Sequence, residues 1–190
     1  AVFRKSRERF KEAEFPGSLR RDMRRETELY FDHILRNDRP LTELIESNYT
    51  FLNQRLAAHY GIPGVTGDEF RQVTLADGHP RGGVLTQGTV LAVTSNPTRT
   101  SPVKRGLFIL EKVLGTPPPP PPPNIPALED LSKGGGLEGT LRENLARHRA
   151  DAKCASCHNR MDPLGLAFEN FNAMGSWRDE ERGVRVEAGG

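Results

Sequence analysis

The chain has 190 residues with a formal net charge of +2, and 35% of its residues are hydrophobic. This length favours one domain or two small ones, and no run approaches the roughly 18 consecutive apolar residues of a membrane-spanning helix. The small net charge gives no case for nucleic acid as a partner. Two cysteines are too few for a disulfide-stapled scaffold.

Both ends of the sequence have the character of internal boundaries. The chain starts at Ala1 without Met, and it stops at Gly190 after a hydrophilic stretch. We therefore expect a piece of a longer or processed polypeptide. A leader peptide is not visible in this piece, which leaves the compartment open.

Apolar periodicity and capping residues predict a mainly α fold in the first hundred residues. A helix is expected over residues 20–36. Its apolar face holds Met23, Tyr30, Phe31, Ile34 and Leu35. A short helix follows at 41–45, and a third is expected to start at Thr50 as N-cap and to stop at Gly61.

The middle of the chain mixes strand and helix signals. Residues 70–75 have strand character, so a short β-hairpin near 70–95 is expected, although the spacing in 84–94 does not choose between helix and strand. Ser101 as N-cap and Pro102 at the first helical position predict a helix that Gly115 ends.

Seven consecutive prolines at 117–123 predict a polyproline strut about 22 Å long. We interpret the strut as a spacer, with a ligand for proline-binding domains as the alternative. Three glycines at 134–136 add a flexible joint. The predicted organisation is a helical segment at 1–64, a linking domain at 65–136 and a minimal haem c-type helical unit at 137–190.

The last segment carries two expected helices. Leu137, Leu141 and Leu145 repeat every four residues, and His148 lies close to the same stripe. Structure is expected to restart at 162–163 and to form a final helix. One face of that helix would hold Leu164, Phe168, Phe171 and Met174.

Residues 154–158 read Cys-Ala-Ser-Cys-His, which matches the attachment motif of haem c. Two thiols one helical turn apart can form thioethers with the two vinyl groups of one porphyrin, and His158 can then ligate the iron as the proximal ligand. A redox dithiol, a disulfide and a zinc site are the alternatives. A dithiol normally follows a strand, and zinc needs four ligands, so haem is favoured.

Residues around the motif suit a haem. A backbone carbonyl in the turn at Pro163 is expected to accept the Nδ1–H of His158. The apolar stripe of Leu164, Phe168, Phe171 and Met174 would wall the porphyrin, or would serve ordinary core packing. Arg160, Trp177 and Arg178 are candidate propionate partners, with surface or packing roles as the alternative.

The distal iron ligand is left open among several residues. Met161 is too close to His158 to cross the haem plane. Met174, His148 and His79 are weaker candidates, and an open sixth position is kept as well. The alternatives are a core methionine for Met174 and a surface histidine for His148. His59 is expected to serve packing.

Several separate strings resemble the planctomycete-type cytochrome c-like multidomain proteins, which are domains of unknown function with a C-terminal haem c motif. The strings lie at 81–88, 94–106, 114–128, 154–158, 161–165 and 168–171. The stretch 48–63 is similar to the domain that precedes them in that family. The likeness covers roughly residues 25–180.

The resemblance implies a large exported protein with one covalent haem at Cys154 and Cys157 and with His158 as the proximal ligand. It supplies no substrate. We expect an electron-transfer module, periplasmic or extracellular and membrane-associated through a partner at most. Its partners would be redox proteins or other haem domains of the same polypeptide, within a larger complex. An architectural subunit with haem as a staple and a haem peroxidase-like enzyme are the alternatives.

Overall fold

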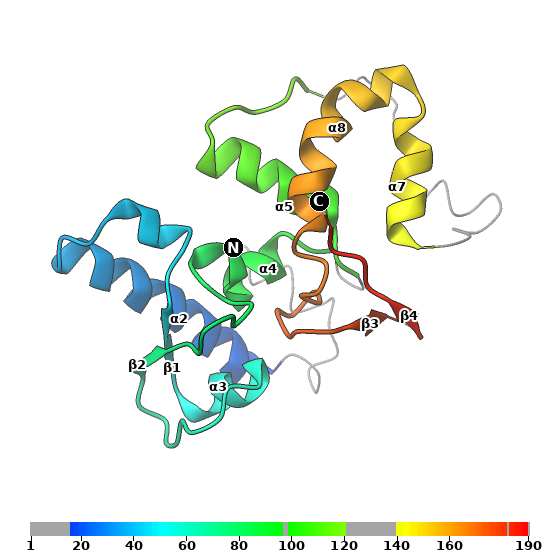
Figure 1. The fold of residues 1–190 in the computed structure, drawn as a ribbon. Coiled ribbons are helices and arrows are strands. Elements are labelled where there is room, and N and C mark those ends of the chain that lie inside the picture. Colours follow the sequence, from blue (N-terminus) through cyan, green and yellow to red (C-terminus); the bar gives the residue numbers. More distant parts are fainter. Residues whose placement is uncertain (1–15, 97–98, 121–139, 182, 190) are drawn as a thin grey trace. The chain divides into compact units, whose positions relative to one another are not determined.

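The computed structural model describes residues 16–96, 99–120, 140–181 and 183–189. These residues are mainly helical with two short antiparallel strand pairs, which confirms the predicted fold class (Figure 1). They divide into two compact units. One holds residues 1–100 and 171–178, and the other holds 101–170 and 179–190. The divisions predicted at 64 and 136 stay predictions.

The first unit starts with α2 (Gly17–Arg36), a 20-residue amphipathic helix. Met23, Tyr30 and Ile34 are almost completely buried, as predicted. Phe31 and Leu35 are exposed instead, 41% and 73% respectively. The buried stripe of α2 runs through Leu19, Met23, Glu26, Tyr30 and Ile34, and Phe31 and Leu35 each lie one position beyond it.

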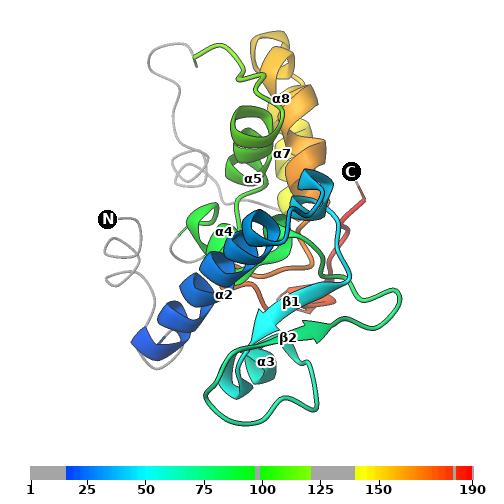
Figure 2. The same ribbon diagram turned by 90° about the vertical axis from the view of Figure 1, so that its left-hand side faces the viewer.

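A strand pair packs beside α2 (Figure 2). After the 3₁₀ turn η1 (Leu41–Leu44), β1 (Tyr49–Leu52) pairs antiparallel with β2 (Arg71–Thr74), with Tyr49 opposite Thr74. The strand at 70–75 was therefore predicted, but its partner was not. Residues 49–52 were expected to begin a helix, and their aromatic and β-branched side chains favour a strand instead.

The helix that follows begins later than the sequence predicted. α3 spans Gln54–Tyr60, and the Oδ1 atom of Asn53 accepts the backbone N–H of Leu56 at 3.0 Å. Asn53 is thus the N-cap, not Thr50, whose hydroxyl donates to Glu26 instead. Gly61 ends the helix with φ of 72°, as expected. The region 84–94 is resolved as helical, with η2 (Val84–Thr86) and α4 (Gly88–Val93).

The second unit is built on the contact between α5 (Pro102–Phe108) and α8 (Ala152–Leu166) (Figure 1). Ser101 caps α5 and Pro102 is its first residue, as predicted. The chain then widens into the π-helical turn η3 (Ile109–Val113) before Gly115. Gly106 and Gly165 lie where a side chain would overlap the backbone of Met161 and of Pro102, so glycine permits the close approach.

Two further elements complete this unit. α7 (Leu141–Arg149) begins with a capping box between Thr140 and Glu143. β3 (Glu180–Glu181) and β4 (Val184–Arg185) form a minimal hairpin. Leu137, the glycines at 134–136 and the prolines at 121–123 lie outside the described residues.

The predicted final helix is wrong. α8 does not restart at Pro163 but runs through it, and it ends at Leu166. Phe168 follows in a turn, and Phe171 and Met174 belong to the other compact unit. There the carbonyl of Asn172 accepts from Gly175, and its side chain accepts from Met174 and Ser176, so local turn bonds replace the helical ladder.

Candidate functional site

The cysteine motif lies on the first half of α8. Asp151 caps this helix by accepting the backbone N–H of Lys153 at 2.8 Å. Cys154 and Cys157 are three residues apart, so they are neighbours on one helix face. Both are free thiols and both are half-buried. The helix therefore presents two half-buried thiols on one face, with His158 directly after them.

His158 is held by a residue that the sequence analysis missed. Its Nδ1 lies 2.9 Å from Oδ1 of Asp162, one turn later on α8. Because a carboxylate only accepts hydrogen bonds, this contact places the ring proton on Nδ1. The expected acceptor, a backbone carbonyl in the Pro163 turn, is thus replaced by the Asp162 carboxylate. The i, i+4 spacing was the available signal, and it is informative only once the helix is known to continue past the motif.

Nε2 of His158 is the atom that remains for a ligand. Within the described part of the chain it has no hydrogen-bond partner. The side chain is 18% exposed, so part of the imidazole is accessible to solvent. A neutral imidazole with its proton on Nδ1 carries the lone pair on Nε2, which is the form that binds a metal.

The Asp162 carboxylate is completely buried, and each of its two oxygens accepts one hydrogen bond. Its Oδ2 accepts from Nη1 of Arg149 at 2.9 Å, while Oδ1 accepts from His158. Arg149 is the last residue of α7, so the carboxylate also joins α7 to α8. A buried carboxylate needs such partners, and these partners fix its position and that of His158.

His148 is half-buried and lies next to His158, a contact that was not predicted from the sequence. The two ring centroids are 4.6 Å apart and the rings are nearly perpendicular at 79°. Burial, and then the neighbouring His158, lower the pKa of His148 below its ordinary value. His148 therefore favours its neutral form and shields one side of the His158 ring.

The remaining predicted site residues fall into two groups. Pro163, Leu164 and Phe168 belong to the compact unit of the motif and are half-buried. The others belong to the first unit: His79, Phe171, Met174, Trp177 and Arg178. Arg160 is exposed on α8, and its Nη2 lies 3.4 Å from the hydroxyl of Thr116.

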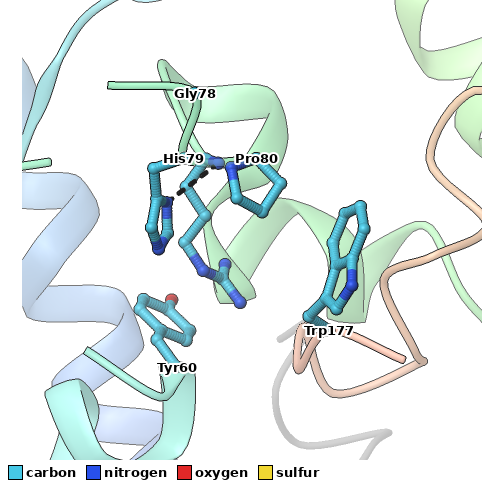
Figure 3. Close-up of a pocket in the computed structure, with 6 residues that line it drawn as sticks. Tyr60, Gly78, His79, Pro80 and Trp177 are labelled. Carbon is cyan, nitrogen blue, oxygen red and sulfur yellow. Dashed lines mark hydrogen bonds between the residues drawn. The ribbon is translucent and has the colours of Figure 1, made fainter. Parts of the chain in front are cut away.

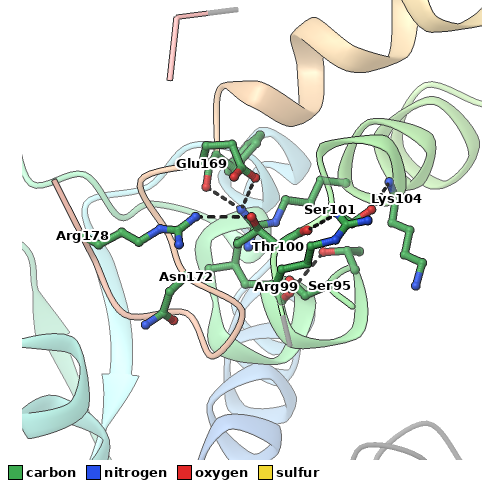
Figure 4. Close-up of polar contacts among 12 residues, drawn as sticks. Ser95, Arg99, Thr100, Ser101, Lys104, Glu169, Asn172 and Arg178 are labelled. Atoms are coloured by element: carbon green, nitrogen blue, oxygen red, sulfur yellow. Dashed lines mark hydrogen bonds and ion pairs between the residues drawn. The ribbon is translucent and has the colours of Figure 1, made fainter. Parts of the chain in front are cut away.

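Those in the first unit have local contacts of their own. Phe171 is buried and packs edge to face on Trp177, with centroids 5.1 Å apart. Met174 packs against the core cluster of that unit, and its carbonyl accepts from Nε2 of His59 at 2.9 Å. Arg178 donates to the hydroxyl of Thr100 at 3.3 Å (Figure 4).

The first unit also contains a buried polar cluster that the sequence did not reveal. Glu26 lies on the inner face of α2, 1% exposed, and accepts from the hydroxyls of Thr50 and Tyr60 at 2.6 Å each. Burial raises the pKa of Glu26 to about 7, against the lowering effect of these bonds. The guanidinium of Arg81 stacks on the Tyr60 ring, 3.6 Å from its centroid. A carboxylate that titrates near neutral pH is thus built into this core.

The described residues hold neither a cluster of metal ligands nor a candidate membrane span. They contain no group of three or more His, Cys, Asp or Glu residues that could hold a metal ion among themselves. No helix in this part of the chain is long and apolar enough to cross a membrane. The first result does not bear on haem, in which the porphyrin supplies four of the iron ligands.

Comparison with known families decides where the chain belongs. A family model named PSCyt3, described as a protein of unknown function (DUF1588), matches residues 81–181. The chain belongs to the PSCyt3 family. A second model, PSD4, described as a protein of unknown function (DUF1592), matches residues 1–62. Domains of both kinds occur in planctomycete-type cytochrome c proteins. No curated protein and no solved structure matches the chain.

The PSCyt3 match includes the cysteine motif, His158 and Asp162, and it also includes the loop that carries Arg81. The PSD4 match covers α2, β1 and α3. The family descriptions assign no activity, so the function is argued from the geometry of the site.

Proposed function

We propose that this chain is an extracytoplasmic segment of a c-type cytochrome that carries one covalent haem for electron transfer. The supporting observation is the arrangement on α8: two free thiols one turn apart, followed by His158 with Nδ1 occupied by Asp162 and Nε2 available. These are the donors that a covalently attached haem needs, two sulfurs for the vinyl groups and one imidazole for the iron.

Attachment at Cys154 and Cys157 needs no oxidant. Each S–H adds across one vinyl double bond, so that sulfur bonds to the carbon next to the ring and the hydrogen goes to the terminal carbon. The bound haem supplies a one-electron couple. The chain supplies the orientation, because Asp162 fixes the His158 ring. Leu164 and Phe168 are half-buried apolar residues of the same unit and are the proposed walls of the porphyrin.

The other contacts predicted from the sequence are part of this proposal. They are Phe171 as an apolar wall, Arg178 as a propionate partner, and Met174, His148 or His79 as the distal ligand. Of these, His148 is the one whose contact with His158 is described. Since haem c is attached outside the cytoplasmic membrane, the proposed location is the periplasm or the extracellular space. The proposed partners are redox proteins or other haem domains of a larger complex.

The test is to produce the full chain in the periplasm of a host that matures c-type cytochromes. We expect a mass gain of one haem that survives acid-acetone extraction, and a low-spin, six-coordinate spectrum. Replacing both Cys154 and Cys157 with Ser should abolish the covalent haem. Ser156→Ala, which changes an exposed residue between them, should retain it. Recovery of the chain without haem, or with a Cys154–Cys157 disulfide, would contradict the proposal.

A second candidate function, a haem enzyme that reacts with peroxide, is favoured by the Asp162–His158 contact. A buried carboxylate on the second nitrogen raises the basicity of a ligating imidazole. This stabilises the oxidised iron and suits an enzyme better than a high-potential carrier. Peroxide turnover together with a five-coordinate, high-spin iron would favour the enzyme over the electron carrier.

A further inference from the structure

A cavity of about 460 Å³ lies in the first compact unit, whereas the cysteine motif belongs to the second (Figure 3). Its volume falls in the range of small-molecule sites. Three segments line it: the end of α3, the loop before η2, and the segment 171–178. The lining residues are Tyr60, Gly78, His79, Pro80, Arg81 and Trp177.

Arg81 gives the cavity a positive wall. The side chain is held in place by Nη1, which donates to the carbonyl of Thr86 at 2.7 Å, and by Nη2, which donates to the carbonyl of Gly175. These bonds use two of the five N–H groups of a guanidinium, and the other three have no partner in the described part of the chain. Its stacking on Tyr60 fixes the plane of the group, so the remaining donors are preorganised.

Little negative charge opposes Arg81 at the cavity. None of the six lining residues is acidic. Glu26 lies behind the ring of Tyr60, whose hydroxyl donates to it, and burial raises the pKa of Glu26 to about 7. Near neutral pH this carboxyl is therefore only partly ionised and compensates Arg81 incompletely.

His79 adds a neutral donor on the same wall. Its Nδ1 accepts the backbone N–H of Arg81 at 3.2 Å. In the neutral ring the proton is then on Nε2, which becomes a donor. Burial, and then the charge of Arg81, lower the pKa of His79, so the neutral form dominates at pH 7.

The opposite wall is apolar and flat. Trp177 is 43% exposed. Its indole packs edge to face on Phe171, with an interplanar angle of 83° and ring centroids 5.1 Å apart, and this contact fixes the orientation of the indole. Figure 3 shows Tyr60 and His79 on one side and Trp177 on the other, with Pro80 between His79 and Trp177. An exposed indole face next to a fixed cation suits a ligand that is flat at one end and anionic at the other.

We propose that this cavity binds a small monocarboxylate with a flat ring, with its carboxylate toward Arg81 and His79 and its ring against Trp177. A planar guanidinium matches the two oxygens of a carboxylate. The site is independent of haem attachment and would persist if the proposed function failed.

The test uses benzoate as the probe on the full chain, with benzamide as its neutral counterpart. Trp177 is the only tryptophan, so its fluorescence reports on this cavity alone. We expect saturable binding by calorimetry with a dissociation constant on the order of 1 mM, a matching change in Trp177 fluorescence, and at least tenfold weaker binding of benzamide.

Variants locate the binding. His79→Phe should weaken benzoate binding about fivefold, because it removes one hydrogen bond, and Arg81→Gln should weaken it tenfold or more. Arg36→Gln, which removes a positive charge from the exposed end of α2, should bind like the wild type. Arg81 also supports the fold, so circular dichroism must show that its variant is native; His79→Phe tests the site without that risk.

Several results would overturn the proposal. They are the absence of saturable binding up to about 20 mM benzoate, equal affinity for benzamide, calorimetric binding without a change in Trp177 fluorescence, and equal weakening in Arg36→Gln and His79→Phe.

Discussion

Oδ1 of Asp162 lies 2.9 Å from Nδ1 of His158, within one turn of α8, and Asp162 has no exposed surface. The second oxygen of the same carboxylate accepts from Arg149 at 2.9 Å. His158 is therefore oriented by a carboxylate that is itself fixed by an arginine on another helix. Any group bound at Nε2 inherits this orientation.

Replacing Asp162 with Asn should raise the reduction potential of the attached haem. Asn can still accept from Nδ1, but it removes the negative charge that stabilises the oxidised iron through His158. Redox titration of the haem-loaded chain measures the shift. Asp151→Asn is the matched control on the same helix, because Asn preserves the cap of α8 while it removes an exposed charge.

An equal potential in Asp162→Asn and wild type would contradict the positioning role of Asp162. A chain without haem would instead contradict the proposed function, so the two failures are distinguishable. The width of the iron–histidine vibrational band gives a second readout, since a less constrained ring should broaden it.

Replacing Gly165 with Ala should destabilise the chain by about 2 kcal/mol. The added methyl would overlap the carbonyl oxygen of Pro102, so α5 and α8 would have to separate, and this outweighs the helix propensity gained. Urea denaturation measures the change. Gly17→Ala is the control, because the nearest atom to its added methyl is the flexible end of Arg20 at 3.5 Å. Similar midpoints for the two variants would refute the close approach.

Glu26 should make stability depend on pH in a defined window. Its pKa is raised from 4.5 to about 7 in the fold, so folding favours the protonated form. This preference contributes on the order of 3 kcal/mol to the free energy of unfolding. The contribution is fully present below pH 4.5 and is lost as the pH rises through 7.

The measurement is the unfolding free energy of wild type minus that of Glu26→Gln across this window, because Gln stays neutral throughout. The difference should fall as the pH rises. Glu28→Gln on the exposed face of α2 is the control, since the pKa of Glu28 is lowered by Arg24 and its effect has the opposite sign. A flat difference for Glu26→Gln would show that the carboxyl is not perturbed.

Asn53→Ala should cost about 1 kcal/mol of stability, because the backbone N–H of Leu56 loses its buried acceptor at the start of α3. Asn53→Ser should recover most of the loss, since serine also caps helices. Thermal or urea unfolding of the three chains decides the point. Equal losses in the Ala and Ser variants would mean that packing, not capping, explains Asn53.

Local signals explain which elements could be predicted. Ser101-Pro102 and Gly61 act on adjacent backbone, so the start of α5 and the end of α3 followed from the sequence. The strand at 49–52 could not be assigned because its pairing partner is about twenty residues away. The final helix was predicted wrongly because the apolar residues from Leu164 to Met174 have helical spacing. The turn signals at Asn172 and Gly175 were given too little weight.

The sequence by itself determined the mainly α class and the two thiols and imidazole of the cysteine motif, because both depend on short-range spacing. Only the tertiary structure decided what holds them. The contact of Asp162 with Arg149 depends on how α7 packs on α8, whereas the neutral-range titration of Glu26 and the cavity at Trp177 depend on segments distant in the chain. Burial and packing set these properties, and the local i, i+4 spacing of His158 and Asp162 is informative only once the helix is known. The two cysteines that excluded a disulfide scaffold lie on α8, the helix that also places the Asp162 carboxylate at Nδ1 of His158.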